Sequence, residues 1–432
     1  MSKSHNMNNK QSNLHNLAIF VFIAILVLNG TYFRARSSAD VPTLDWLILA
    51  RLLVCLIGFV IGIILIPKKG SLRFGAKALL FYIFATGLSA IGSPMPKIVL
   101  GYFVLLLGSG ALMIALVYNS RSVFQLEHLE KIWFLTVAIL VIKDSLISLF
   151  TGGQGEIGRI GMGVTHANQI SFLSGLVFWV SFKFQRSNLS VIMWFIRVFL
   201  VFILLTAISR ISILAFVMAG FSYFIFRFMG HYRAQMIMLA GIGFLGTFFL
   251  LSLSFGQEWS NDIVKYLKRG QEETGLTTFT GRTYIWDQAK KKAFESSIIG
   301  HGYGTTRFAL GELAEAEFQA FHSHNDFLEA FLATGLIGFI PFLGIYLYSL
   351  KWAVNFSLLR KVFSHDLSLH AVCVVIMIFF ASGFETYIAG KLSPVQPLFF
   401  LYLLSLDRTS GFGKNASASD QNGSSDTGRN DK

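Results

Sequence analysis

The sequence has 432 residues, of which 54% are hydrophobic and 14% are charged, and its mean hydropathy is +0.60. Soluble globular domains carry about a quarter charged residues, so this composition excludes an ordinary soluble enzyme and indicates a membrane protein. The formal net charge is +13. The basic residues lie between long apolar segments rather than on one soluble face, so membrane topology explains them, and we exclude a nucleic-acid-binding protein.

About twelve segments meet the length of roughly 20 apolar residues that a membrane-spanning helix needs. The predicted fold class is therefore an all-α polytopic membrane protein. We predict a transmembrane domain at 16–406, with a long periplasmic loop at 257–326, an N-terminal segment at 1–15 and a tail at 407–432. The twelve segments lie near 16–29, 46–66, 74–92, 96–118, 131–150, 168–184, 190–208, 210–228, 234–256, 327–350, 368–384 and 392–406.

The two ends of the chain differ from its middle in composition. The first sixteen residues are polar, and Leu17 to Leu28 is apolar. A cleaved signal peptide is the alternative to a first span, but no small-residue cleavage site follows, which favours the span. The tail after Arg408 is rich in Ser, Asn, Gly and Asp, which predicts disorder.

The distribution of Lys and Arg over the short loops predicts the orientation of the chain. With the N-terminus inside, the inner short loops carry about twice as many of these residues as the outer ones, which is the bias that cytoplasmic loops show. Both termini are then cytoplasmic and the long loop faces the periplasm. Loops longer than about 60 residues escape this rule, so the basic residues of the long loop do not change the prediction.

Few polar residues interrupt the apolar segments. Lys143 and Asp144 lie in the fifth segment, and we expect them to pair or to face the interior of the helix bundle. Cys55 and Cys373 both lie in apolar segments, which predicts packing residues rather than a disulfide or a metal site.

The long loop has its own order of motifs. Residues 281–295 begin with Gly281 and Arg282, and their apolar positions, which include Trp286, recur at helical spacing with lysines between them. This pattern predicts an amphipathic helix that lies at the membrane surface. A turn with three glycines follows at 300–304, which lets the backbone bend sharply and approach a ligand.

Polar side chains then gather where the loop enters the tenth predicted span. His322, His324 and Asn325 precede the apolar segment, and we expect Ser323 to cap its helix with Asp326 at the third position. A polar cap with interfacial histidines and a reactive site are both compatible with this spacing. A helix N-terminus favours anions, and phosphate binds there readily.

Two arginines and an outer-loop pair complete the candidate site. Arg210 opens a predicted span at its outer edge, and Arg282 opens the amphipathic helix. Arg210 could be a snorkelling residue and Arg282 a surface residue, whereas together they suit a diphosphate, which arginine binds with two parallel hydrogen bonds. His166 and Asn168 precede the sixth span, where a helix cap is the simpler interpretation. A neutral histidine such as His324 can accept a proton from an attacking hydroxyl.

Four stretches of the chain resemble the O-antigen ligase and O-antigen polymerase superfamily of bacterial envelope glycosyltransferases. Each motif is short, whereas their order and the predicted topology make the combination specific from about Leu17 to Leu406. The stretches are His324-Asn325 followed after nine residues by Gly335-Leu336-Ile337-Gly338, Thr280-Gly281-Arg282-Thr283 with Trp286 and the turn Gly300-His301-Gly302-Tyr303-Gly304, Ser209-Arg210, and His166-Ala167-Asn168.

The resemblance implies a metal-independent glycosyl transfer at the periplasmic face, without a cofactor. The donor would be a glycan on undecaprenyl diphosphate, and the acceptor a glycan or the lipid A core. The protein would sit in the bacterial inner membrane, with a chain-length regulator as a possible partner. His324, Arg282 and Arg210 would be the catalytic residues, with His324 favoured over its neighbour as the base. The residues assigned to substrate binding are Asn325, His322, Trp286, Gly302, Gly304, His166 and Asn168.

Several functions stay open at this point. Within the family, a ligase, a polymerase of O-antigen, capsule or exopolysaccharide, and a protein O-oligosaccharyltransferase share one donor chemistry, and we favour the first two. A transporter or flippase would need polar groups or broken helices near the middle of the membrane, for which Lys143 and Asp144 are the candidates. A structural scaffold is the remaining class.

Overall fold

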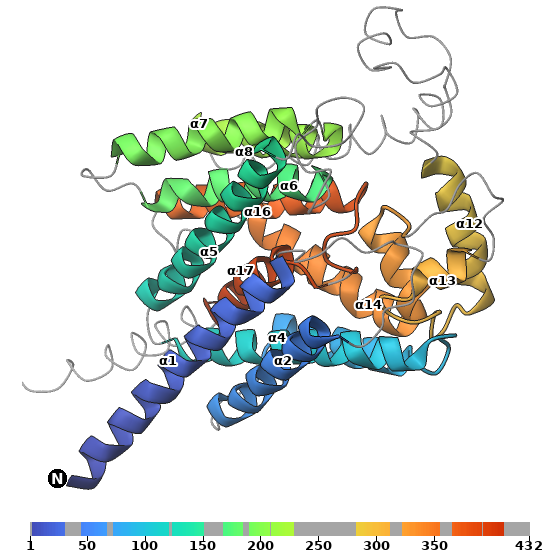
Figure 1. The fold of residues 1–432 in the computed structure, drawn as a ribbon, viewed down its shortest axis with the longest axis horizontal. Helices are drawn as coiled ribbons and strands as arrows, with labels where there is room; N and C mark the ends of the chain where they lie inside the picture. The colour runs from blue at the N-terminus through green and yellow to red at the C-terminus, as the bar shows by residue number, and fades with distance from the viewer. Residues whose placement is uncertain are drawn as a thin grey trace, which may run out of the picture.

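The computed structural model of the protein describes residues 2–30, 45–66, 72–120, 123–150, 167–184, 190–207, 209–228, 282–311, 322–354, 365–390 and 392–409. Within these ranges the secondary structure is helical and holds no strand, which confirms the all-α class (Figure 1). The helices are α1 (Ser2–Gly30), α2 (Trp46–Leu65), α3 (Phe74–Leu88), α4 (Pro96–Asn119), α5 (Val123–Phe150), α6 (Ala167–Ser181), the 3-10 helix η1 (Phe182–Phe184), α7 (Ser190–Thr206), α8 (Arg210–Phe228), α12 (Arg282–Glu295), α13 (Thr306–Gly311), α14 (Asp326–Val354), α16 (His365–Ser382) and α17 (Val395–Thr409).

Six of the described helices are long and apolar enough to cross a membrane, and four shorter ones are also apolar. The protein is therefore membrane-embedded and polytopic. The predicted total of twelve spans stays a prediction, because the segment near 234–256 lies outside the described residues. The helical backbone of α1 begins at Ser2, so the polar N-terminal segment continues the first helix, and the apolar part of that helix covers Asn13–Gly30.

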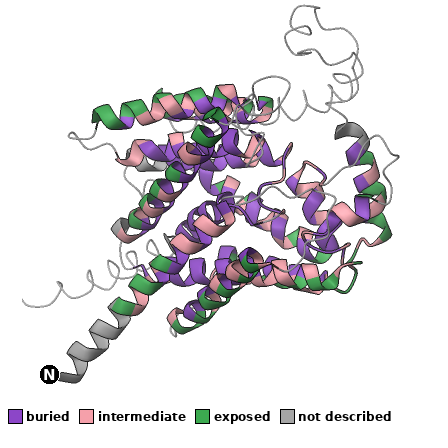
Figure 2. Ribbon diagram, in the orientation of Figure 1, coloured by how far each residue is buried: buried purple, intermediate pink, exposed green. Residues whose placement is uncertain are grey.

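Burial separates the helices into inner and outer ones. α17 carries an almost continuous run of buried side chains, whereas α2 and α7 expose large apolar side chains on one face, such as Leu53, Val60 and Phe195 (Figure 2). Helix α2 packs on α4, α3 on α14, and α8 on α16. Because the exposed faces are apolar along their whole length, lipid is the environment that suits them.

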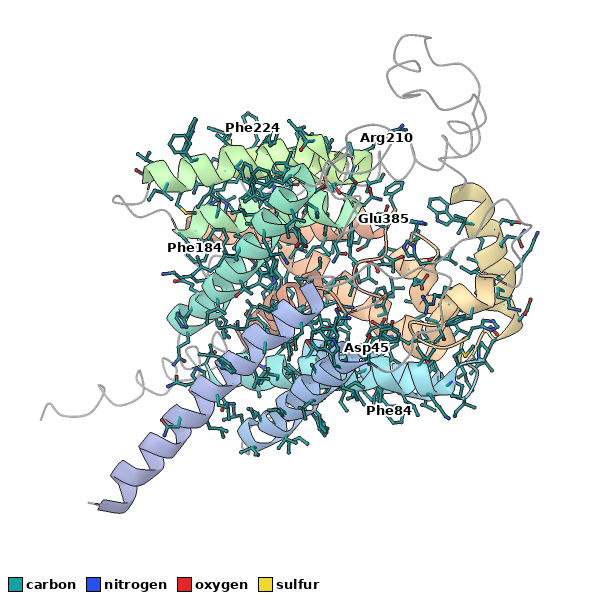
Figure 3. The ribbon with its side chains drawn as sticks, viewed as in Figure 1. Asp45, Phe84, Phe184, Arg210, Phe224 and Glu385 are labelled. Atoms are coloured by element: carbon teal, nitrogen blue, oxygen red, sulfur yellow. The ribbon has the colours of Figure 1, made fainter. Side chains whose placement is uncertain are left out.

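The helix directions bring several termini to one end of the molecule. Helices α6, α8, α14 and α17 begin at this end, α16 finishes there, and α12 and α13 lie beside it (Figure 1). Arg210 and Glu385 both lie toward this end, although 175 positions separate them in the sequence (Figure 3). Side chains from distant parts of the sequence can therefore meet there.

The opposite end is held by one carboxylate. Asp407, near the end of α17, accepts hydrogen bonds from the backbone N–H groups of Gly75 (3.1 Å) and Ala76 (3.0 Å) in the first turn of α3. The hydroxyls of Tyr118 (2.8 Å) and Tyr348 (3.1 Å) also donate to it. The carboxylate thus satisfies the open N–H groups of α3 and joins four helices far from the candidate site.

Two expectations about polar and sulfur-containing residues are confirmed. The Lys143 Nζ lies 2.8 Å from a carboxylate oxygen of Asp144, so these residues pair as expected, and the Asp144 side chain is buried. Cys55 and Cys373 are both buried free thiols, as packing residues should be.

Helix α14 is kinked at Gly335, whose φ of 58° lies in the left-handed region that favours glycine. In a regular helix, the N–H groups of the two residues after Gly335 would donate to carbonyls four residues earlier. Here the loop between α12 and α13 bonds to all four of these groups. The bonds are His301 N to Leu332 O (2.9 Å), Gly302 N to Ala333 O (2.9 Å), Leu336 N to Ser297 O (2.8 Å) and Ile337 N to Ile298 O (3.2 Å).

We predict that Gly335→Ala destabilises the protein by more than 1 kcal/mol, of order 1–3 kcal/mol. An alanine Cβ at this position would lie 2.3 Å from the backbone of Ile298, and it would also force an L-residue into positive φ. Thermal unfolding of the detergent-solubilised protein measures the effect. Gly101→Ala is the matched control, because nothing lies within 4 Å of its added Cβ and helix propensity favours alanine. Equal melting temperatures for both variants would contradict this role of the kink.

Candidate functional site

A histidine, a glutamate and an asparagine form a chain of hydrogen bonds at the end where the helix termini meet. The Nδ1 of His324 lies 3.1 Å from Oε2 of Glu385. The other oxygen of Glu385 accepts a hydrogen bond of 2.7 Å from the Asn168 side-chain amide. The Glu385 side chain is 7% exposed and that of His324 25%, so the carboxylate is shielded while the imidazole reaches the surface.

The Glu385 contact fixes the tautomer of His324. A carboxylate accepts hydrogen bonds, so Nδ1 carries the proton and Nε2 keeps a lone pair. The backbone of His324 has a φ of 50°, and among the described residues it is the one non-glycine with positive φ. Such strain persists where surrounding contacts enforce it, and it concentrates at functional sites.

Asn325 caps α14 and also holds the loop that carries Glu385. Its Oδ1 accepts from the N–H groups of Phe327 (2.9 Å) and Leu328 (3.0 Å), and its amide donates to the Gly383 carbonyl (2.9 Å). The expected N-cap at Ser323 was therefore wrong by two residues. Ser and Asn are both good caps, and here the Ser323 hydroxyl donates instead to the carbonyl of Asn325.

Asp326 holds the loop that carries Glu385 by hydrogen bonds with the backbone of that loop. Its side chain is fully buried, and one oxygen accepts from three successive backbone N–H groups, those of Tyr387 (3.0 Å), Ile388 (2.9 Å) and Ala389 (2.7 Å). The Tyr346 hydroxyl donates to the other oxygen at 3.3 Å. Asp326 was expected to help cap its own helix, whereas it stabilises the 383–390 loop that follows α16.

The backbone carbonyl and the backbone N–H of Ser323 each form a hydrogen bond with a side chain. The indole N–H of Trp286 on α12 donates to its carbonyl at 2.8 Å, and its own N–H donates to Oε2 of Glu329 at 2.9 Å. The second oxygen of Glu329 accepts from the hydroxyl of Thr306 on α13. Trp286, predicted from the sequence as a site residue, thus contacts the backbone beside His324.

His322 lies against the neighbouring imidazole. The ring centroids of His322 and His324 are 3.9 Å apart in an edge-on arrangement, and the His324 N–H points at His322 Nδ1 at 3.3 Å. The two histidine rings therefore lie against each other, and Glu385 contacts that of His324.

The glycine-rich turn lies behind the kink of α14. Gly302 and Gly304 have φ of 103° and 73°, and an added Cβ would lie 2.4 Å from Ser93 and from the ring of Tyr102. Between them, Tyr303 is buried and its hydroxyl donates to the Gly390 carbonyl; burial also raises its pKa, so the hydroxyl stays protonated. The turn supports the loop that carries Glu385, and substrate binding by its glycines stays a prediction.

Arg210 is the first residue of α8, and the start of this helix lies close to Asn168. The Ser212 hydroxyl, in the first turn of the same helix, donates to the Asn168 carbonyl at 3.3 Å and lies 2.8 Å from the hydroxyl of Ser209. The side chain of Arg210 is exposed at this end (Figure 3). The structure thus brings the N-terminus of α8 close to Asn168, whose side chain bonds Glu385.

Helix α12 is amphipathic, but its apolar face was assigned to the wrong partner. Trp286, Ala289 and Ala293 are buried and face α13 and α14, so protein rather than the membrane surface covers them. Phe294, expected on that face, is 71% exposed. Arg282 is the first residue of α12, one turn before Trp286, and its backbone alone is described.

Glu385 is the site residue that the sequence interpretation missed. It lies in a short loop after α16, where a single acidic residue follows Gly383 between two apolar segments. A carboxylate at the end of a membrane span is energetically unfavourable unless it has a partner. The presence of Glu385 there was the signal that the sequence offered. His166, a predicted site residue, lies outside the described residues.

Comparison with known proteins matches one part of the chain to a family. Residues 195–343, about a third of the chain, match the model of the family described as O-antigen ligase. This confirms the resemblance to the O-antigen ligase and polymerase superfamily. The matched residues contain both predicted arginines and the His322–Asn325 turn, whereas Asn168 and Glu385 lie outside them.

Two curated relatives match shorter segments. The exopolysaccharide production protein ExoQ of Rhizobium meliloti is 42% identical over 72 residues, which is 15% of this chain and 17% of the relative. An uncharacterised protein of Haemophilus influenzae is 26% identical over 121 residues, 27% of this chain and 28% of the relative. The alignments thus cover less than a third of the length of either relative.

We predict that Asp326→Ala loosens the 383–390 loop, while Asp326→Asn does so far less. Alanine leaves three buried N–H groups without an acceptor, each costing about 1–3 kcal/mol, whereas asparagine keeps one oxygen for them and can turn its amide toward the Tyr346 hydroxyl. Hydrogen–deuterium exchange of the peptide that spans this loop measures the change. Equal exchange in both variants and the wild type would contradict the anchoring role.

Proposed function

We propose that the protein is a glycosyltransferase that moves a glycan from a polyprenyl diphosphate to an acceptor hydroxyl. The single observation that carries the proposal is the contact between His324, which lies within the O-antigen ligase match, and Glu385, which lies outside it. It supports a histidine with a protonated Nδ1 and a basic Nε2, which general-base catalysis requires.

The proposed step needs one base and a stabilised leaving group. The acceptor hydroxyl gives its proton to Nε2 of His324 as its oxygen bonds to the anomeric carbon of the donor sugar. The bond from that carbon to the phosphate oxygen breaks, and the electron pair leaves with the diphosphate. Glu385 stabilises the imidazolium that forms, and the Asn168 amide keeps the carboxylate oriented.

Arg210 and Arg282 bind the diphosphate in this proposal. Each is the first residue of its helix, so their positive charges add to the partial positive charge of two helix N-termini. Arginine stabilises a departing diphosphate without a metal ion, because its planar guanidinium bonds two oxygens at once. Metal independence is part of the proposal, as are substrate contacts by His322 and Asn325.

We place the site on the periplasmic face of the bacterial inner membrane, with both termini cytoplasmic. The similarity to an exopolysaccharide production protein favours polymerisation of an envelope polysaccharide, and the family model equally supports ligation to a lipid A core. The donor would be an undecaprenyl diphosphate glycan, and a chain-length regulator would be a partner of the polymerase.

We predict that His324→Ala and Glu385→Gln both reduce product formation. Loss of the base should lower turnover at least a hundredfold, and loss of the carboxylate charge at least about tenfold. Glycan analysis of a deletion strain complemented with each variant measures this, with protein levels in the membrane compared. Glu295→Gln is the matched control, since Glu295 is an exposed α12 residue paired with Lys292. Normal glycan with His324→Ala would refute the mechanism.

The type of lost product separates the candidate activities. Lipopolysaccharide with one repeat unit in the deletion strain indicates an O-antigen polymerase, and long chains retained on the carrier lipid indicate a ligase. Loss of secreted polysaccharide with normal lipopolysaccharide indicates an exopolysaccharide polymerase.

We predict that a reporter inserted at Lys290 reads periplasmic. Lys290 is exposed on α12, at the end of the molecule that holds the candidate site, so the insertion disturbs no buried contact. A reporter fused after Asn119, at the other end of α4, should read cytoplasmic. The reverse pattern would invert the proposed orientation.

A further inference from the structure

We propose that Trp286 and Glu329 are positioning residues that fix His324 through the peptide of Ser323, so that α12 and His324 move as one unit. This inference rests on the proposed function, because it concerns how the base is held. Both side chains act one residue earlier, on the carbonyl and the N–H of Ser323.

The turn needs such support because its backbone is unfavourable. His324 has a φ of 50°, a conformation that a side chain with a Cβ rarely adopts. The turn itself supplies a weak bond, from the His324 N–H to His322 Nδ1 at 3.3 Å. Strain of this kind persists when other contacts determine the conformation, and the two Ser323 bonds act on the turn together with the contacts of His324 to Glu385 and of Asn325 to Gly383.

Glu329 suits this task because a carboxylate offers two acceptors. One oxygen takes the Ser323 N–H at 2.9 Å, and the other takes the Thr306 hydroxyl. All three residues are buried, so no water replaces a lost partner. A glutamine could still accept the Ser323 N–H with its oxygen and donate its amide to the Thr306 hydroxyl, whereas an alanine removes both bonds. Glu329 therefore joins the turn to α13 as well as to its own helix.

Trp286 links the turn to α12. The indole is 7% exposed, and its N–H bonds the Ser323 carbonyl at 2.8 Å. Arg282 begins the same helix one turn earlier. A shift of α12 along its axis would therefore pull on the peptide next to the base. In this proposal, donor binding at the start of α12 and the position of the His324 imidazole depend on each other.

The test uses the full-length protein in liposomes. The donor is the lipid-linked glycan that accumulates in a strain lacking the gene. We expect Trp286→Phe and Glu329→Ala each to lower kcat about tenfold or more while KM for this donor changes less than about twofold, since a small displacement of a reacting group reduces rate more than binding. Combined with His324→Ala, neither substitution should reduce the residual rate further, because the residue that they position is gone.

A matched control separates positioning from general loss of packing. Trp133 also donates a buried indole hydrogen bond to a backbone carbonyl, that of Pro394 at 2.7 Å, on other helices. Trp133→Phe should keep the wild-type kcat. Thr306→Val, which frees Glu329 from α13 with little change of shape, should lower kcat at unchanged KM and replaces Glu329→Ala if that variant does not fold.

Three results would overturn the inference. These are equal kcat for Trp286→Phe and Trp133→Phe, an increase of KM at constant kcat, and full additivity with His324→Ala. If instead His324→Ala itself turns over at the wild-type rate, the proposed function fails. Loss of activity in His324→Ala together with normal kcat in Trp286→Phe and Glu329→Ala overturns the positioning role alone.

Discussion

The buried carboxylate of Asp326 is the constraint on which the rest of the site depends. A fully buried charge is tolerated where donors surround it, and here the donors are three backbone N–H groups of one loop and the Tyr346 hydroxyl. That arrangement binds the loop after α16 to the start of α14. Because Glu385 lies on this loop, its meeting with His324 follows from the anchoring two residues away.

The three consecutive residues His324, Asn325 and Asp326 divide the work of the site. The first presents an imidazole to the surface, the second caps α14 and holds Gly383, and the third anchors residues 387–389. One turn of chain thereby sets the position of the base, the start of a helix and the loop of the acidic partner. This explains why a short motif can characterise a large membrane-protein family.

Length and hydropathy were enough to predict the helical class and most helix positions, because about 20 apolar residues are the physical requirement for a span. The sequence also identified the motifs that contain Trp286 and His324 as candidate parts of the site. Glu385 was missed because its partner is 61 residues away and no local pattern reports a contact of that kind. The predicted N-cap of α14 was two residues too early, because Ser323 and Asn325 have similar capping propensity. The backbone conformation of His324 makes Asn325 the cap.

The kink at Gly335 fixes the length of the segment between His324 and the kink. The loop before α13 hydrogen-bonds to the kink, while the start of α14 bonds to the loop of Glu385. Adding or deleting one residue between them would rotate one attachment by about 100° and shift it by about 1.5 Å relative to the other. Both attachments could not then form together. The nine residues between Asn325 and Gly335 are therefore constrained in number, as Asp326 and Glu329 among them are constrained in identity.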